Sequence, residues 1–172
     1  LFSFFNEMWY LCVMFLRRLI LFAALLPSLF LAYAQELDSI RASLITCSPG
    51  QEVYALYGHT ALRLQNYTTG QDLVFNYGMF SFRQSHFVWR FVRGQCDYMV
   101  APIPWQYFTP EYERRGSSIT EQVLNLTQEE ANRMYLRMLE ECKPENRQYR
   151  YNFLYNNCTT KARDIIEQCI LG

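Results

Sequence analysis

The chain lacks an excess of positive charge: its 172 residues contain 16 lysines and arginines against 16 aspartates and glutamates. Nucleic-acid-binding domains normally show a basic stripe, so we expect no nucleic-acid partner. The chain also has only two histidines, His59 and His86, and no C-x-x-C motif. Zinc sites and dithiol redox sites usually depend on such clusters, so no metal site, no redox role and no cofactor are predicted.

A signal-like segment stands at the N-terminus. Arg17 and Arg18 are followed by an apolar run over residues 19–32 and by the small-residue pattern Ala32-Tyr33-Ala34. A positive end, an apolar middle and a small-residue cleavage site are typical of a secretory signal peptide. The run is shorter than the roughly 20 apolar residues of a membrane span, which disfavours the alternative, a retained N-terminal anchor.

We therefore predict a signal peptide over residues 1–34, with translation starting at Met14 or at an alternative codon upstream. The exported part, residues 35–172, has 138 residues, 14 of them basic and 15 acidic. This is the usual size of one domain, about 100 to 150 residues. A single domain is therefore expected.

The exported part contains five cysteines, and an odd number leaves at least one thiol unpaired or shared between chains. The four cysteines other than Cys158 are Cys47, Cys96, Cys142 and Cys169. They could form two disulfides, in any of three pairings, or none.

Hydrophobic periodicity predicts an α+β fold, with an antiparallel sheet packed against helices. The predicted strands span 39–46, 59–64, 72–77, 95–100 (ended by Pro102 and Pro104) and 118–125. Three helices are predicted. The first spans 87–93, and the second opens with the capping box of Thr127 and Glu130 and stops near Cys142. The last has Cys158 in its first turn. Residues 107–116 show no clear period and are predicted to form a loop.

Cys158 and His59 are the candidate catalytic pair. A thiol in the first turn of a helix faces the positive end of the helix dipole, which favours the thiolate. A nearby imidazole would lower the thiol pKa further and serve as base and acid in acyl transfer. The free amides of the first turn could hold the oxyanion. The alternatives are a small buried thiol and a histidine bonded within the core.

Asn76 is the candidate group that orients the histidine. If the hairpin turn is centred between Thr68 and Thr69, Ala61 pairs with Asn76, and Asn76 lies diagonal to His59 on the same face of the sheet. A register slip by one residue would turn Asn76 to the opposite face. Tyr57 and Asn157 flank the pair and are candidate substrate contacts, although turn and capping roles explain them equally well.

The motifs around the pair resemble papain-like hydrolases of the NlpC/P60 type. Gly58-His59-Thr60-Ala61-Leu62-Arg63 resembles their histidine strand, and Tyr155-Asn156-Asn157-Cys158 resembles the start of their cysteine helix. Because the histidine precedes the cysteine here, the order resembles the circularly permuted branch, which includes lecithin:retinol acyltransferase-like proteins.

A closer resemblance, over roughly residues 43–171, is to the Lnb N-terminal periplasmic domain family of Gram-negative bacteria. It is carried by Leu44-Ile45-Thr46-Cys47-Ser48-Pro49-Gly50, Tyr57-Gly58-His59-Thr60, Val74-Phe75-Asn76-Tyr77-Gly78 and Tyr155-Asn156-Asn157-Cys158-Thr159-Thr160. This resemblance implies a periplasmic location. Family members often continue into membrane segments, whereas this chain ends at Gly172, so we expect a truncated product that contacts the membrane only through its signal or a missing C-terminal region.

Together these resemblances imply a periplasmic cysteine hydrolase or acyltransferase that acts on an amide or ester bond of a cell-envelope substrate, either a peptide or a lipid. In that function Cys158 is the nucleophile, His59 the general base and acid, and Asn76 the orienting group. The alternative is a non-catalytic periplasmic module that binds envelope components or assists an adjoining membrane region. The oligomeric state does not follow from the sequence.

Overall fold

The structure, a computed structural model, describes residues 14, 38–50, 56–80, 86, 89–90 and 93–171. The strands are β1 (Ile40–Cys47), β2 (His59–Asn66), β3 (Gln71–Phe80), β4 (Asp97–Pro104), β5 (Ile119–Val123) and β6 (Gln148–Arg150). The main helices are α3 (Trp105–Arg114), α4 (Gln128–Glu141) and α5 (Cys158–Leu171).

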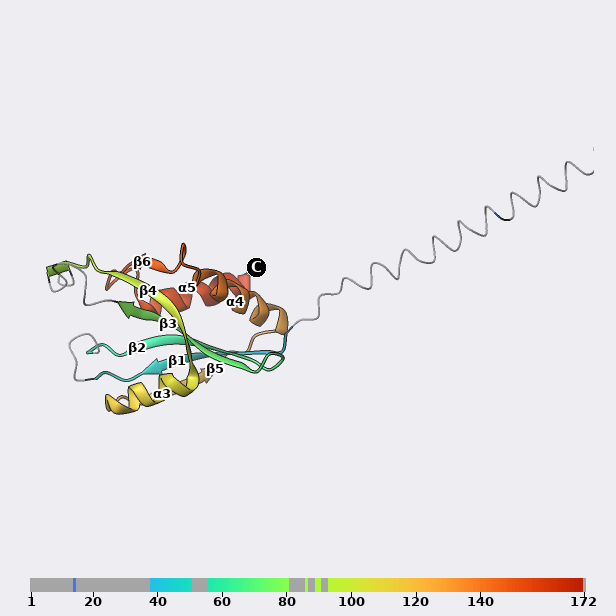
Figure 1. Ribbon diagram of the computed structural model, residues 1–172, viewed down its shortest axis with the longest axis horizontal. Coiled ribbons are helices and arrows are strands. Elements are labelled where there is room, and N and C mark those ends of the chain that lie inside the picture. The colour runs from blue at the N-terminus through green and yellow to red at the C-terminus, as the bar shows by residue number, and fades with distance from the viewer. Residues whose placement is uncertain are drawn as a thin grey trace, which may run out of the picture. The chain divides into compact units, whose positions relative to one another are not determined.

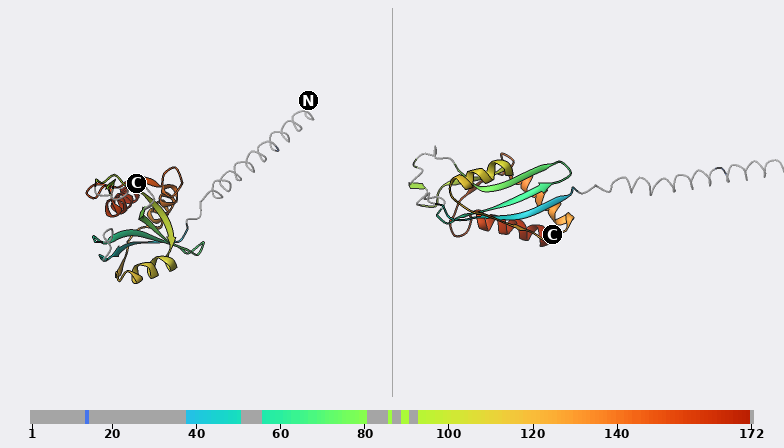
Figure 2. Two further views of the ribbon diagram at one scale, coloured as in Figure 1. Left: turned by 60° about the vertical axis from the view of Figure 1, so that its left-hand side comes forward. Right: turned by 90° about the horizontal axis from the view of Figure 1, so that it is seen from below.

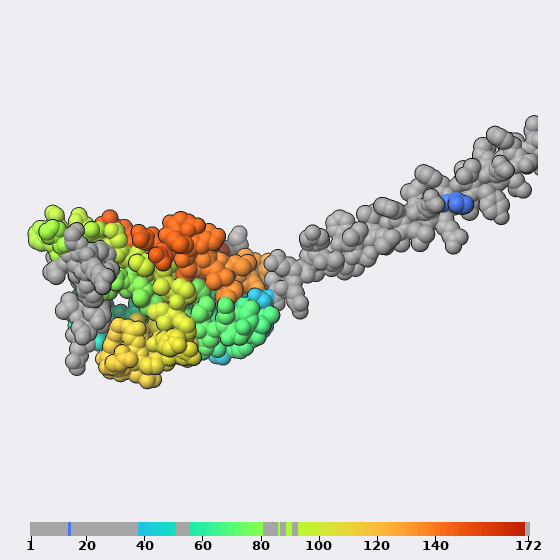
Figure 3. All heavy atoms as spheres, in the orientation of Figure 1, coloured from blue at the N-terminus to red at the C-terminus, as the bar shows by residue number. Residues whose placement is uncertain are grey.

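The strands form one sheet in the order β5-β1-β2-β3-β4-β6, and every neighbouring pair is antiparallel. Helices α4 and α5 cover one face of this sheet, and α3 covers the other (Figure 1, Figure 2). In Figure 3 the yellow surface of α3 and the orange surface of the chain after β5 accordingly lie on opposite sides of the strands. The predicted α+β class, an antiparallel sheet packed against helices, is confirmed.

The hairpin of β2 and β3 has the predicted register. Leu62 pairs with Phe75 and Asn66 pairs with Gln71, and the same register continued along β2 places Ala61 opposite Asn76. The turn is fixed by Asn66, whose Oδ1 accepts the backbone amides of Thr68 (3.0 Å) and Thr69 (2.9 Å). Because this local asparagine turn sets the register, it also decides which side chains share a face with His59.

The larger core lies between the sheet and the helices α4 and α5. Phe75 of the central strands packs there with Met134 of α4 and Ile165 of α5, and each of these side chains is almost fully buried. The predicted capping box at the start of α4 is present, with the Thr127 side chain accepting from the Glu130 amide and the Glu130 carboxylate accepting from the Thr127 amide. This helix ends at Glu141, as predicted.

The other face of the sheet is covered by a helix where the sequence predicts a loop. The prediction of a loop over residues 107–116 is wrong, because α3 runs from Trp105 to Arg114. Trp105, Phe108 and Tyr112 follow the helical i, i+3, i+7 spacing and belong to the core on this face. The proline at position 110, inside the helix, argues against a helix on local grounds and conceals this spacing.

The fourth strand extends beyond the predicted range of 95–100. It runs to Pro104, one of the two prolines predicted to end it, and pairs Pro102 with Phe75. Proline lacks a backbone donor and is tolerated where a strand lies at a sheet edge. Of the described strands, β6 pairs with β4 only from Asp97 to Met99. The prolines therefore lie in the part of β4 that forms the open edge.

A buried ion cluster joins α3 to the sheet. The guanidinium of Arg63 contacts both oxygens of Asp72 (2.8 and 2.6 Å) and one oxygen of Glu121 (2.9 Å), while the ring of Trp105 lies 3.8 Å from it. Arg63 is only 9% exposed. A buried cation needs such partners, so the cluster holds β2, β3, β5 and the first residue of α3 in a fixed arrangement.

Two predicted segments lie outside the described residues. The predicted signal peptide falls there except for Met14, and the predicted helix over 87–93 falls there except for Trp89, Arg90 and Arg93. In the part of the chain that the structure describes, no helix combines the length and the apolar character needed to cross a membrane.

We predict that Phe108→Ala lowers the free energy of unfolding by about 3 to 5 kcal/mol, because it removes a fully buried ring that anchors α3. Urea unfolding followed by circular dichroism measures the change. Tyr107→Ala is the matched control, since Tyr107 lies on the same helix but is 65% exposed, and it should change stability by less than about 0.5 kcal/mol. Equal effects of the two variants would show that α3 does not pack as described.

Candidate active site

Cys158 is the first residue of α5, as predicted. The residue before it, Asn157, is the N-cap: its Oδ1 accepts the amides of Thr159 and Thr160, each over 3.0 Å. The backbone amide of Asn157 in turn donates to the Thr160 hydroxyl (2.8 Å). These bonds fix the first turn and place the thiol at the positive end of the helix dipole.

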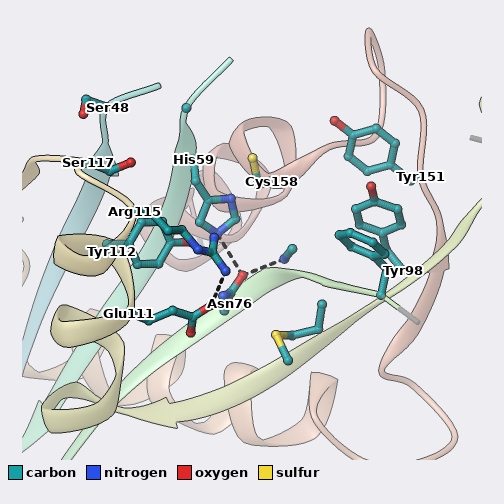
Figure 4. A pocket seen from close by; sticks show the side chains of 14 residues that line it. Ser48, His59, Asn76, Tyr98, Glu111, Tyr112, Arg115, Ser117, Tyr151 and Cys158 are labelled. Atoms are coloured by element: carbon teal, nitrogen blue, oxygen red, sulfur yellow. Dashed lines mark hydrogen bonds and ion pairs between the residues drawn. The ribbon is translucent and has the colours of Figure 1, made fainter. Parts of the chain in front are cut away.

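His59 is the first residue of β2 and meets Cys158 at one end of the sheet. Its ring stacks on the ring of Tyr112 from α3, with a centroid distance of 6.1 Å and an angle of 13°. Its Nε2 lies 2.8 Å from Oδ1 of Asn76. The structure therefore brings together the three predicted catalytic residues, one from a helix and two from the hairpin (Figure 4).

The bonds of Asn76 determine which nitrogen of His59 carries the proton. The amide of Gly78 donates to Asn76 Oδ1 over 2.7 Å, and a backbone amide can only donate, so this atom is the carbonyl oxygen. A carbonyl oxygen can only accept, so His59 Nε2 must carry a hydrogen. In the neutral ring Nδ1 is then unprotonated, and this nitrogen lies on the side of the ring that faces Cys158 (Figure 4).

Gly78 leaves the space that the imidazole occupies. A Cβ on this residue would lie 2.8 Å from His59 Cε1 and 3.0 Å from Asn76 Oδ1. The pairing of β3 with β4 is irregular between Asn76 and Met79, and Gly78 lies within this irregularity. Its amide can therefore turn to the Asn76 side chain, and its missing side chain leaves room for the ring.

The surroundings of Cys158 favour its thiolate. Burial raises the pKa of the Cys158 thiol. The hydrogen bond and charge of His59, the amide of Thr60 and the hydroxyl of Thr159 lower it by more than burial raises it, so the pKa falls to about 7. The other four cysteines of the described part have raised pKa values, about 12 for Cys47 and about 11 for Cys142, because burial dominates there.

None of these five cysteines is part of a disulfide. Of the alternatives that the sequence leaves open, two disulfides or none, the structure has none. Cys158 is therefore available as a nucleophile.

A cavity of about 120 Å³ opens between the pair and two sets of side chains. On one side Tyr112 and Arg115 line it together with Glu111, which forms an ion pair with Arg115. On the other side Tyr98 stacks with Phe80 (centroids 5.0 Å apart) and with Tyr151 (4.3 Å). The thiol thus faces a narrow space with a charged wall and an aromatic wall (Figure 4).

The two predicted binding residues do not line this cavity. Tyr57 is 78% exposed, and its ring lies against Phe153. Both ends of the Asn157 side chain are engaged in the chain itself, since Oδ1 caps α5 and Nδ2 donates to the Phe153 carbonyl (2.7 Å). The capping alternative therefore accounts for Asn157.

Residues that sequence reasoning missed form most of the cavity wall. Tyr112, Arg115 and Glu111 come from α3 or directly follow it, and the i, i+3, i+7 spacing that ends at Tyr112 is the signal that could have identified them. Tyr151 belongs to the run Tyr149, Tyr151, Phe153 and Tyr155, whose period of two indicates a strand or a wall near the site. No comparable signal marks Tyr98, because it reaches the cavity through the pairing of β4 with strands distant in the sequence. Within the described ranges no group of three or more histidine, cysteine, aspartate or glutamate side chains is placed to hold a metal ion.

Comparison with known proteins gives a family match. The family model described as Lnb N-terminal periplasmic domain matches residues 31–170, which include Cys158, His59, Asn76 and the rest of the cavity lining. Neither the curated proteins nor the solved structures contain a match.

We predict that Cys158 reacts with iodoacetamide at a rate that rises with pH around a midpoint near 7, since the thiolate forms as the pH passes the thiol pKa. His59→Ala removes the group that lowers this pKa and leaves burial, which raises it. The midpoint should move up by at least about one unit, which slows labelling at pH 7 about tenfold. Mass spectrometry of the Cys158 peptide measures the rate, with the slow Cys142 peptide as internal reference. Equal rates in both proteins would show that His59 does not activate the thiol.

We predict that Gly78→Ala also raises the labelling midpoint, because the new Cβ displaces the imidazole. The overpacking should lower the free energy of unfolding by about 1 to 3 kcal/mol, and urea unfolding checks that the fold persists. Met79→Ala is the control, because Met79 also lines the cavity but is 38% exposed, and its midpoint should stay near 7. A folded Gly78→Ala variant with an unchanged midpoint contradicts the positioning role of Gly78.

Proposed function

Because the chain belongs to the Lnb N-terminal periplasmic domain family, as its motifs predict, we propose that it is a periplasmic cysteine hydrolase or acyltransferase that acts on an amide or ester bond of a cell-envelope substrate. One observation carries this proposal. A cysteine at a helix N-terminus, with its pKa lowered to about 7 by a histidine, lines a cavity. Perturbed pKa values of this kind concentrate at functional sites.

In the first half of the reaction the Cys158 thiol gives its proton to His59 Nδ1, and the thiolate attacks the carbonyl carbon of the substrate. A tetrahedral intermediate forms and collapses. The bond to the leaving amine or alcohol breaks, and that group takes the proton from the imidazolium. The acyl group is then held on Cys158 as a thioester.

In the second half His59 Nδ1 takes a proton from water or from an acceptor amine or alcohol, which attacks the thioester. The thiolate leaves, takes the proton back, and the free enzyme is restored. Water as the acceptor makes the reaction a hydrolysis, and an amine or alcohol makes it an acyl transfer. Throughout, Asn76 keeps the Nε2 hydrogen in place, so that Nδ1 is the nitrogen that exchanges protons.

The amide of Cys158 itself is the donor we assign to the oxyanion. The amides of Thr159 and Thr160 are bonded to the Asn157 side chain, and the Lys161 amide bonds to the Asn157 carbonyl. Among the described residues no acceptor is bonded to the Cys158 amide. It is therefore free to stabilise negative charge next to the nucleophile.

The chain order supports a circularly permuted papain-like arrangement, since the histidine strand precedes the cysteine helix. A signal peptide over residues 1–34 fits the family's periplasmic location. The small cavity suits the reacting bond and its immediate neighbours rather than a whole substrate. The aromatic wall can pack against an apolar group next to that bond, and the ion pair of Glu111 and Arg115 can bind polar groups.

We predict that p-nitrophenyl acetate gives a burst of p-nitrophenol stoichiometric with enzyme, together with an acetyl group on the Cys158 peptide that hydroxylamine removes. The reason is that acylation of an activated thiolate by a phenyl ester is fast. Stopped-flow absorbance and peptide mass spectrometry measure the two signals. His59→Ala should slow the burst about 10² to 10⁴-fold.

Two variants serve as controls for this experiment. Cys142→Ala should keep the burst, because the pKa of Cys142 is raised and the residue lies outside the cavity. Cys158→Ala should abolish it. A burst that survives in Cys158→Ala, or its absence from the parent protein, would overturn the catalytic proposal and leave the non-catalytic binding module.

A further inference from the structure

Five large apolar side chains are exposed on two segments that lie directly before His59 and Cys158. Tyr57 lies with its ring 4.7 Å from that of Phe153, so the two segments form one surface. We call this surface the apolar tip; its members and their exposed fractions are Leu56 (51%), Tyr57 (78%), Phe153 (50%), Leu154 (66%) and Tyr155 (80%). Contiguous exposed apolar surface of this kind usually marks an interaction site.

The backbone of the tip is held by asparagine side chains. Asn152 Oδ1 accepts the amides of Leu154 (2.9 Å) and Tyr155 (3.0 Å), and the backbones of Asn152 and Asn156 exchange two bonds of 2.9 and 3.0 Å. The Phe153 carbonyl accepts from Asn157. Because these polar groups already have partners, they can leave water without losing their hydrogen bonds, which lowers the cost of moving the tip into an apolar medium.

Residues 151–160, which include three members of the tip, contain no charged side chain. Basic residues lie on both sides of this stretch, namely Lys143, Arg147 and Arg150 before it and Lys161 and Arg163 after it, and Glu145 and Asp164 are the nearest acidic residues along the chain. Three of the basic residues form ion pairs, namely Lys143, Arg150 and Arg163. Within the described residues Arg147 and Lys161 form no ion pair. An uncharged aromatic centre with cationic flanks complements a surface that is apolar inside and anionic outside.

We propose that the apolar tip docks on a lipid surface, with its aliphatic and aromatic side chains among the acyl chains and headgroups, and with Arg147 and Lys161 near anionic headgroups. Tyrosine, which supplies two of the five members, is enriched at membrane interfaces. A second copy of the chain fits less well, because two tips in contact would bring their cationic flanks together.

This inference goes beyond the proposed function and does not depend on it, since a non-catalytic module would dock equally. For an enzyme the consequence is direct. Cys158 follows Tyr155 by three residues and His59 follows Tyr57 by two, so docking brings the cavity to the lipid surface.

Hydroxyl-radical footprinting of the full chain tests the proposal, with and without vesicles of phosphatidylethanolamine and phosphatidylglycerol. Oxidation of each side chain is measured by mass spectrometry and divided by that of Tyr67, which is 58% exposed in the turn at the far end of β2 from His59. Vesicles should lower this ratio severalfold at Tyr57, Phe153, Leu154 and Tyr155. The ratio separates docking through the tip from attachment through the apolar N-terminal segment, because attachment through that segment would leave the ratio of tip to Tyr67 oxidation unchanged.

Variants make the outcome decisive. The double variant Leu154→Ser and Tyr155→Ser should lose the protection of Tyr57 and Phe153. The control Leu136→Ser, which changes a side chain that is 59% exposed on α4, should keep it. Cys158→Ala should also keep it, so failure of catalysis and failure of docking are distinguishable. An unchanged ratio in the parent protein overturns the proposal. So does protection that grows with protein concentration in the absence of vesicles, which would assign the tip to contact between copies.

Discussion

The site depends on one acceptor atom, Oδ1 of Asn76. It accepts from the Gly78 amide and from His59 Nε2, and through these two bonds the backbone of β3 decides the tautomer of a histidine on β2. The unprotonated nitrogen then faces Cys158, whose pKa falls to about 7. Each of these properties follows from the one before it, so the strand register is the first requirement for an activated thiol.

Cys158 and His59 come from opposite sides of the sheet. The His59 side chain lies on the face that α3 covers, whereas α5 packs on the other face. They meet because each is the first residue of its element, and the two elements begin at the same end of the sheet. The helix α3 completes this junction: the buried cluster of Arg63 and Trp105 anchors its start, and Tyr112 near its end stacks on the imidazole. The buried charge network around Arg63 therefore contributes, through α3, to the position of the His59 ring.

The parts of the site that could be predicted from the sequence are those with local causes. The register of the hairpin follows from the Asn66 turn, and the position of Cys158 follows from the Asn157 cap. The helix α3 could not be predicted in this way, because Pro110 in its interior contradicts it locally and its stability comes from Phe108 packing on the sheet. The sequence also left the role of Asn157 open. An asparagine side chain uses the same atoms to cap a helix and to contact a ligand, so its position in the sequence does not distinguish the two roles.

The segment from Asn152 to Cys158 shows how one short sequence can serve two purposes. Its asparagine side chains turn inward to bond the backbone, which leaves Phe153, Leu154 and Tyr155 to point into solvent. Asn157 belongs to both arrangements, because its Oδ1 caps α5 while its Nδ2 holds the Phe153 carbonyl. Cys158 and the exposed tip are therefore parts of one hydrogen-bonded unit. A contact made by the tip is consequently made at a fixed distance from the thiol, which is the geometry required of an enzyme whose substrate lies in the surface that it binds.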